Sequence, residues 1–490
     1  MITAGLDVDT QITVGLDFGT HQTKICIEAR DGVERKYTFM KYKDANGKLQ
    51  YTLPSIINIC PDGKLQYGYI APKSKGERIR YFKQGAFRTI PYMKMTQEDA
   101  LYYSCWYIAF ILFDLEEKYG QSFTIQMGAP TDSGHYEIAK QISVRLLASA
   151  YRLVEDVFKN DKKKFLDTHI ANLKKLTIIE QYSLGLKDNY GILVFPEAYA
   201  CLKPLTSKGK IADSIGLMVD IGGGTTDISL FTIAPKDEDL NMVSNSNDRR
   251  KERVPMVYDF HSIDMGLNFL TNALQKEKEN SIQSSIENTE VQHKGILHSL
   301  GELFSHQNNK TPDYQKTTSN VESDEEFDIR RTEQFIQEIR NYVSSLDKRI
   351  RAELKKFSSF TKKDFDDALS NRPIIYCGGG STFKTLRKNY FFFTDRRLIT
   401  NSDWDIKYVE DAKEIISLGL IPILSTAYGL AISVKNDNIT QKSFKNMFDY
   451  LREVDRNRKR QISGLDSQEN SRKNYSYTSI NDYDSYDAWK

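Results

Sequence analysis

The sequence predicts an α/β fold made of two lobes with a duplicated plan, and three observations support this prediction. Two strand–turn–strand units, at residues 12–28 and 217–232, repeat one pattern at low identity. A third glycine-rich turn, at residues 378–382, directly follows a short apolar strand. Amphipathic helical patterns lie between these units, and strands that alternate with helices are typical of α/β domains.

The first half of the chain begins with a predicted β-hairpin whose turn contains an acidic residue and a glycine. Its predicted elements are, in order, strands at 12–16, 24–28 and 51–59, a helix at 97–118, a strand at 123–127 and a helix at 136–158. Helical periodicity places five apolar residues of the last helix on one face, which are Ile138, Ile142, Leu146, Leu153 and Val157. The second half is predicted to contain strands at 217–220 and 227–232, helices at 267–278 and 331–356, a strand at 373–377 and a closing helix at 418–434.

These elements predict how the chain divides into parts. Lobe I covers residues 1–205 and is completed by the helix at 411–434, and lobe II covers 206–410. Lobe II includes a polar insertion at 277–328, whose Ser, Asn, Gln and charge content predicts partial disorder. Residues 435–490 form a polar extension, and its Tyr/Asp-rich end is predicted to be a disordered tail or a short motif that docks a partner.

The composition argues against several classes of protein. The 68 basic and 66 acidic residues nearly cancel, whereas nucleic-acid and membrane-surface proteins usually carry a basic patch. The most apolar run, residues 101–113, is shorter than the ~20 residues that span a bilayer, so a buried helix is expected. The five cysteines are scattered, which predicts buried thiols in a reducing compartment. The N-terminus lacks a signal-peptide pattern, so we expect a cytoplasmic protein without membrane or nucleic-acid partners.

The first turn, residues 17–23 (DFGTHQT), has the chemistry of a phosphate site. Gly19 lets the backbone approach an anion, and successive amides of such a turn form a concavity for phosphate oxygens. Thr20 and Thr23 add hydroxyl donors. Asp17 does not favour phosphate directly, so its expected role is to hold, through water, a Mg²⁺ ion that bridges the phosphates. A capped β-turn without a ligand is the alternative interpretation.

The second turn, residues 220–227 (DIGGGTTD), is the more specific signal. Three consecutive glycines cost about 0.5–1 kcal/mol each relative to alanine, so such a run is expected where the backbone touches a ligand. Asp220 occupies the place of Asp17 in the repeated plan, and the two carboxylates are expected to converge on one cation. Thr225 and Thr226 supply further donors.

The third turn, residues 378–382, opens a predicted helix at 384–389, where backbone amides and the helix dipole suit an α-phosphate or a ribose. The order and spacing of the three turns resemble the actin, sugar-kinase and heat-shock 70 kDa chaperone ATPase superfamily. The segments VGLDFGTHQTKICI and LMVDIGGGTTDISLF are similar to the two phosphate motifs of the chaperone's nucleotide-binding domain, and IIYCGGGSTF is similar to its adenosine motif. The resemblance covers roughly residues 12–434.

This resemblance implies a duplicated actin-like ATPase (ribonuclease H-like) fold, in which two lobes clasp ATP or ADP with Mg²⁺ in a central cleft. Asp17 and Asp220 would be the catalytic carboxylates associated with magnesium. Lys83 would be the lysine that reaches the γ-phosphate, with an ordinary surface lysine as the alternative. The residues that would bind the nucleotide are Gly19, Thr20, His21, Gln22, Thr23, Gly222, Gly223, Gly224, Thr225, Thr226, Gly379, Gly380 and Ser381.

One departure from the family pattern concerns the attacking water. The family's first connecting helix commonly begins Glu-Pro-x-Ala-Ala, and its glutamate helps to orient that water. Alignment on Pro196 puts Phe195 at the glutamate position, and Glu197 would lie on a helix face turned about 200° away. Hydrolysis is therefore expected to be weak or lost, unless a small loop shift lets Glu197 reach the site as a catalytic residue.

The favoured functional prediction is an ATP-binding, heat-shock 70 kDa chaperone-like protein. It would couple Mg-ATP binding, with slow hydrolysis, to lobe closure and to interaction with a protein partner or co-chaperone. The residues after 434 contain too few apolar side chains for a client-binding β-sandwich. The alternatives are an actin-like ATPase that self-assembles into filaments, a small-molecule kinase, and a nucleotide-binding scaffold without turnover.

Overall fold

The computed structural model describes most of the two predicted lobes. The described residues are 10–70, 75–88, 95–120, 122–130, 136–207, 215–235, 253–271, 329–356, 369, 372–383, 386, 396–434, 437, 439 and 441–452. The predicted insertion at 277–328, the end of the tail, and most of the predicted helix at 384–389 lie outside these residues.

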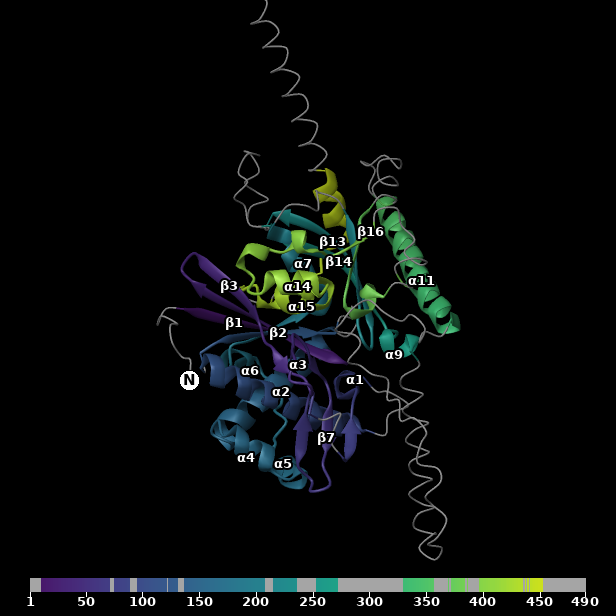
Figure 1. The fold of residues 1–490 in the computed structure, drawn as a ribbon. Helices are drawn as coiled ribbons and strands as arrows, with labels where there is room; N and C mark the ends of the chain where they lie inside the picture. The colour runs from purple at the N-terminus through teal and green to yellow at the C-terminus, as the bar shows by residue number, and fades with distance from the viewer. Residues whose placement is uncertain are drawn as a thin grey trace, which may run out of the picture.

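The first sheet has the first predicted hairpin at its centre (Figure 1). Its main strands lie in the order β11 (Ile192–Pro196), β10 (Thr124–Ala129), β1 (Gln11–Asp17), β2 (Gln22–Asp31) and β3 (Glu34–Phe39), and the short β6 (Leu53–Pro54) also pairs with β2. Strands β1, β2 and β3 form an antiparallel meander, whereas β10 and β11 run parallel to β1.

The second sheet repeats this topology. Its order is β14 (Arg253–Ile263), β13 (Thr226–Pro235), β12 (Gly216–Ile221), β15 (Ile374–Cys377) and β16 (Arg396–Leu398). Strands β12, β13 and β14 are antiparallel, and β15 and β16 run parallel to β12. The duplicated α/β plan predicted from the two hairpins is therefore confirmed, although the predicted boundaries of the two lobes remain predictions.

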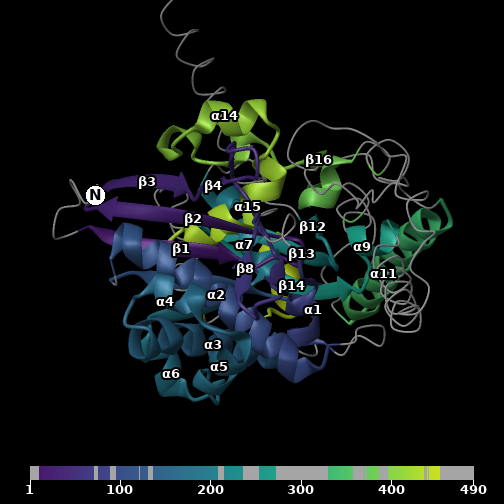
Figure 2. The same ribbon diagram turned by 60° about the horizontal axis from the view of Figure 1, so that its bottom comes forward.

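Two long helices cover one face of the first sheet (Figures 1 and 2). Helix α2 (Gln97–Tyr119) is capped by the Thr96 side chain and contains the apolar run that the sequence predicted to be buried. Helix α3 (Tyr136–Arg152) continues as a π-helical segment, Leu153–Val157. The predicted apolar face of this region is wrong at Ile138, which is 56% exposed. No helix in the described part of the chain is long and apolar enough to cross a membrane.

The second sheet is covered by α11 (Ile329–Leu354), which lies along its outer side in Figure 1. The helix buries Phe335, Val343 and Leu346 in the same cluster as Leu217 and Val219 of β12. The predicted strand at 51–59 is instead divided between β6 and β7, and the described part of the predicted helix at 267–278 is a single turn, α9 (Leu267–Leu270).

The remaining elements are short. They are β4 (Tyr42–Lys43), β5 (Leu49–Gln50), β7 (Ile57–Ile59), β8 (Leu65–Tyr67), β9 (Glu77–Ile79), α1 (Phe82–Phe87), α4 (Lys162–Asp167), α5 (Ile170–Leu176), α6 (Leu184–Asn189), α14 (Ala412–Ser417) and four 3₁₀ segments, Lys203–Ser207, Gly379–Thr382, Asn401–Asp403 and Ile406–Tyr408.

Two helices connect the sheets, α7 (Glu197–Leu202) and α15 (Ile421–Ala431). Helix α15 packs against β1, β2 and α7 and also contacts β15, while α7 contacts β11 and β12. Small residues allow this close crossing of the two helices. A Cβ on Gly429 would overlap the Ala200 carbonyl oxygen of α7, and one on Gly15 of β1 would overlap the α15 backbone.

Replacing Gly429 by alanine is expected to lower the free energy of unfolding by roughly 1–3 kcal/mol, because the added methyl group forces α15 away from α7. Urea denaturation followed by circular dichroism measures this loss. Gly185→Ala is the matched control, since no atom lies within 4 Å of a Cβ at that position. Equal stability of the two variants would contradict close packing of the connecting helices.

Candidate functional site

The two hairpin turns, at residues 18–21 and 222–225, lie against each other. A Cβ on Gly223 would lie 2.9 Å from the imidazole Cγ of His21, and one on Gly224 would overlap the Gln84 side chain. His21 Nε2 is hydrogen-bonded to Asn268 Oδ1 of the second lobe. The glycine run is therefore needed here because side chains at these positions would prevent the close approach of the two lobes.

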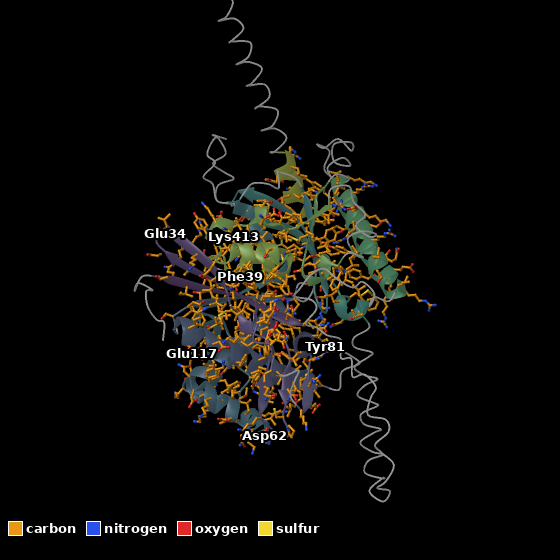
Figure 3. The ribbon with its side chains drawn as sticks, in the orientation of Figure 1. Glu34, Phe39, Asp62, Tyr81, Glu117 and Lys413 are labelled. Atoms are coloured by element: carbon orange, nitrogen blue, oxygen red, sulfur yellow. The ribbon has the colours of Figure 1, made fainter. Side chains whose placement is uncertain are left out.

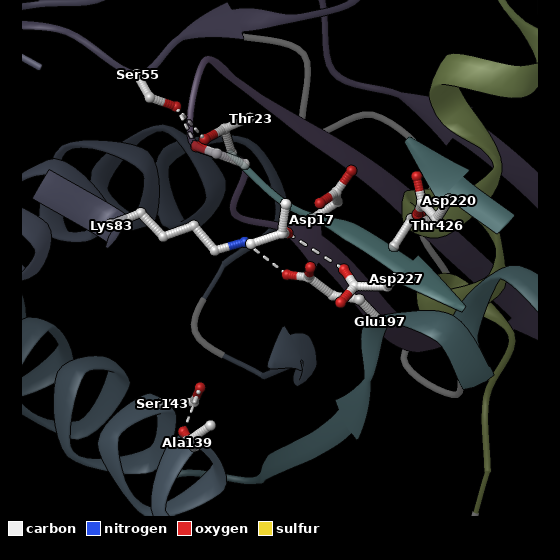
Figure 4. Close-up of polar contacts among 12 residues, drawn as sticks. Asp17, Thr23, Ser55, Lys83, Ala139, Ser143, Glu197, Asp220, Asp227 and Thr426 are labelled. Atoms are coloured by element: carbon white, nitrogen blue, oxygen red, sulfur yellow. Dashed lines mark hydrogen bonds and ion pairs between the residues drawn. The ribbon is translucent and has the colours of Figure 1, made fainter. Parts of the chain in front are cut away.

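Four carboxylates gather beside these turns, and their exposed fractions lie between 3% and 9%. Asp17 ends β1, Asp220 lies near the end of β12, and Glu197 is the first residue of α7. Asp227 is the cross-strand partner of Asp220 in the second hairpin. Figure 4 shows Asp17, Glu197 and Asp227 around the end of the Lys83 side chain, with Asp220 beside Thr426.

Two lysines of the first lobe belong to this cluster. Lys83 of α1 is 7% exposed, and its Nζ lies 2.6 Å from Glu197 Oε1, so it is not an ordinary surface lysine. Lys24 Nζ lies 2.9 Å from Asp17 Oδ2. Glu197 reaches Lys83 across Gly128 of β10, where a Cβ would lie only 2.8 Å from Glu197 Cγ.

Burial and mutual repulsion make these acids harder to ionise. Burial, followed by the charge of Asp17, raises the pKa of Asp220. Burial also raises the pKa of Glu197, although Lys83 opposes this change. The pKa of Asp227 rises to about 7 through burial and the charge of Glu197. Each shift means that ionisation of the carboxyl is unfavourable unless a positive charge compensates it.

The carboxylates fit a divalent cation. Among the described residues Asp220 and Asp227 form no ion pair, and the buried Asp227 Oδ1 accepts no hydrogen bond. Mg²⁺ prefers oxygen ligands and usually keeps several waters, so Asp17 and Asp220 suit the water-mediated role that the sequence predicted for them. The uncompensated negative charge and the unsatisfied oxygen are the observations that support this fit.

Some predicted phosphate-binding hydroxyls hold the turns in place. Thr23 Oγ1 lies 3.1 Å from Ser55 Oγ, and Ser55 Oγ donates to the Gly19 carbonyl at 2.7 Å. Thr226 Oγ1 donates to the Met265 carbonyl at 2.8 Å. Both threonines are fully buried. The half-buried side chains of these turns are Thr20, His21, Gln22 and Thr225.

The third turn lies beside the carboxylates. A Cβ on Gly378, which has a φ of 81°, would overlap Asp220 Oδ1, and one on Gly380 would overlap Ile221 of β12. Ser381 is fully buried, and its hydroxyl donates to the Gly378 carbonyl at 2.7 Å. The structure therefore brings Gly379, Gly380 and Ser381 to the same end of the strands in the second sheet as Asp220. The Ser381 hydroxyl bonds within the turn and closes it.

Phe195 does not occupy the position that the sequence alignment gave it. It lies in β11, fully buried in a cluster with Ala200 and Leu430, and the Lys203 ammonium lies 4.2 Å from its ring centroid. Glu197 instead reaches the carboxylate cluster. The expected 200° separation was wrong because the strand ends at Pro196, so the two residues do not share a helix.

Sequence reasoning missed Asp227, Lys24 and Asn268. The first two could have been found from hairpin register, because directly paired residues point to the same face of a sheet. Asp17 pairs with Lys24 in the first hairpin, and Asp220 pairs with Asp227 in the second. Asn268, which also donates to Gln84 Oε1 at 3.4 Å, follows the glycine-rich turn by more than forty residues, and no motif marks it.

Comparisons with known proteins add little to this geometry. No family model and no curated protein matches the sequence. One solved structure that the chain is similar to is MreB 5 of Spiroplasma citri bound to AMPPNP, with 12% sequence identity and a TM-score of 0.35. The match covers 85% of this chain and 95% of that one. The duplicated topology and the residues that it brings together are therefore the features that point to a function.

Proposed function

We propose that this chain is an actin-like ATPase that binds Mg-ATP between its two lobes. The observation that carries the proposal is the convergence of four carboxylates beside paired glycine-rich turns. Asp17, Asp220 and Asp227 come from two topologically equivalent sheets, and Glu197 comes from the start of α7. Buried carboxylates with raised pKa values near a lysine are typical of functional sites. Asp17 and Asp220 lie at the carboxyl ends of β1 and β12, which is where open α/β sheets bind ligands.

The proposed roles follow from chemistry. Asp17 and Asp220 would hold Mg²⁺ through water, and the ion would supply positive charge to the phosphate groups of the nucleotide. Backbone amides of the turns at 19–23 and 222–226 bind phosphate, and the turn at 379–381 lies against the nucleoside. Lys83 balances the γ-phosphate charge, and Glu197 orients the attacking water. The position of Glu197 supports turnover, which Phe195 had put in doubt.

Nucleotide binding would act as a switch between lobe positions. Residues of the two lobes contact each other at the site. His21 is hydrogen-bonded to Asn268, and Arg88 Nη2 donates to Ser262 Oγ at 3.1 Å. A ligand that binds one lobe arrangement more tightly shifts the population toward it. We propose the heat-shock 70 kDa-like switch, acting through a protein partner, as the main form of this activity, with filament assembly as its competitor.

Replacing Asp220 by asparagine is expected to weaken Mg-ATP binding roughly 10- to 100-fold, because a neutral amide cannot compensate the charge of the ion. Isothermal titration calorimetry with and without Mg²⁺ measures this loss. Asp62→Asn is the control, since Asp62 is an exposed carboxylate at the far tip of the first lobe (Figure 3). Unchanged affinity in Asp220→Asn would refute the magnesium assignment.

High-speed sedimentation of the full chain separates the two forms of the activity. A switch stays in the supernatant with ATP, ADP or no nucleotide, whereas a filament-forming ATPase pellets with ATP above a critical concentration. ATP-dependent pelleting would contradict the switch and support filament assembly, and it would leave the assignment of the nucleotide site unchanged.

A further inference from the structure

A second cluster of potential ligands adjoins the nucleotide site. The Sγ atoms of Cys201 and Cys377 and a carboxylate oxygen of Asp220 all lie within 4.8 Å of one another. Cys201 belongs to α7, Asp220 to β12 and Cys377 to the end of β15. Both cysteines are fully buried and free, and Asp220 is 9% exposed. The nucleotide proposal uses only Asp220 among these three residues.

The spacing of these atoms is close to that of a tetrahedral zinc site. With Zn–S bonds of about 2.3 Å and Zn–O bonds of about 2.0 Å, a sulfur and an oxygen ligand lie about 3.5 Å apart. Cys201 Sγ lies 3.2 Å from Asp220 Oδ2, so these two atoms would need to move apart by only a few tenths of an ångström to bind the ion. The Thr426 hydroxyl lies 2.9 Å from Cys201 Sγ and 3.3 Å from Asp220 Oδ2, so it borders the same group of atoms.

The chemistry of the cluster favours a thiophilic ion over magnesium. Thiolates select zinc and similar soft or borderline metals, whereas Mg²⁺ takes oxygen ligands. The thioether of Met218, 3.6 Å from Cys377 Sγ, makes the surroundings softer still. The other buried cysteines, Cys26 and Cys105, belong to no such group among the described residues.

We propose that Cys201, Cys377 and Asp220 form a site for Zn²⁺ or a similar thiophilic divalent cation. On binding, the two thiols release their protons to solvent and coordinate as thiolates, and Asp220 supplies one oxygen. An Asp220 that ligates zinc cannot serve Mg²⁺ in its proposed role, so the ion acts as an inhibitor that links α7 to β12 and β15. This consequence rests on the proposed function, whereas the metal site itself does not.

The test uses the full chain without nucleotide, in a non-thiol reductant. Zinc is titrated in competition with a chromophoric chelator, and Co²⁺ is added separately as a spectroscopic probe. We expect one tight zinc site per chain and a near-ultraviolet thiolate-to-cobalt charge-transfer band. Cys201→Ser and Cys377→Ser are each expected to weaken zinc binding at least about 100-fold, while Cys26→Ser and Cys105→Ser, which also alter buried thiols, retain it.

Absence of the cobalt band in the wild-type chain would overturn the proposal without reference to any variant. Zinc affinity that is the same in Cys201→Ser, Cys377→Ser and wild type would also overturn it. A final arm adds Mg-ATP, whose affinity is expected to fall when zinc is bound first. Failure of ATP binding without zinc would count against the proposed function, whereas failure of zinc binding counts only against this site.

Discussion

Replacing Glu197 by glutamine is expected to reduce ATP turnover roughly 100- to 10,000-fold while Mg-ATP affinity changes only a few-fold. The amide is nearly isosteric, so the contact with Lys83 Nζ, now 2.6 Å from Glu197 Oε1, can be kept as a hydrogen bond to a neutral amide oxygen. The carboxylate charge that would orient and polarise an attacking water is lost. Phosphate release under steady-state conditions measures turnover, and calorimetry of the same preparation measures affinity.

Phe195→Leu is the matched control for this experiment, because Phe195 is the residue to which the sequence alignment gave the water-orienting position. The change removes ring contacts in a buried cluster with Ala200 and Leu430, so we expect a stability loss of about 1 kcal/mol and turnover close to wild type. If Phe195→Leu lowered turnover as much as Glu197→Gln, or if Glu197→Gln left turnover unchanged, the assignment of Glu197 would be wrong.

The main strands and the glycine-rich turns could be predicted because local patterns determine them. Alternating or continuous apolar residues define β1 and β12, and each turn follows from its glycines and acidic residue. The shared order of the two sheets then follows from duplication of one plan. Close contact with another backbone explains the glycines at 15 and 429, and close contact with the His21 ring explains Gly223. The sequence shows such glycines without showing what they touch.

Other features could not be predicted because they depend on where one element ends and another begins. Pro196 ends β11, and the helical turn that starts at Glu197 redirects the next side chain into the site. A one-residue error at such a boundary changes which side chain faces the cleft. Long-range partners such as Asn268 and His21, separated by 247 residues, depend on how the lobes meet.

A buried amine under the connecting helices is a further feature that no motif marks. Lys203 follows α7, is 4% exposed, and donates to Gln126 Oε1 and to the Ile432 carbonyl, each at 3.1 Å. The nearby carboxylate of Glu28 already accepts bonds from the Tyr37 hydroxyl and the Ser433 amide. The effect of burial is therefore larger than the attraction to Glu28, and it lowers the pKa of Lys203 from 10.5 to about 7.

Replacing Lys203 by methionine should therefore change the pH dependence of stability. Below about pH 7 both the folded and the unfolded wild-type chain carry the charged lysine, and its burial costs up to about 5 kcal/mol for a pKa lowered from 10.5 to about 7. As the pH rises toward 10.5 the folded chain loses this proton first, so wild-type stability increases relative to the variant. Methionine keeps the packing against Phe195 but has no charge to bury. We expect the stability advantage of Lys203→Met to shrink by about 2–3 kcal/mol between about pH 6 and about pH 9.

Urea denaturation of both chains across this pH range measures the difference in their free energies of unfolding. The change of this difference with pH matters more than its absolute value, because the variant also loses two hydrogen bonds worth about 1 kcal/mol each. Lys163→Met, at an exposed position, is the control and should show no such slope. A difference that is independent of pH would mean that Lys203 keeps its ordinary pKa, and that Gln126, Ile432 and the Phe195 ring compensate its burial in full. A slope of the predicted sign would instead show that the junction between α7 and α15 holds an amine that is neutral in the folded chain at mildly alkaline pH.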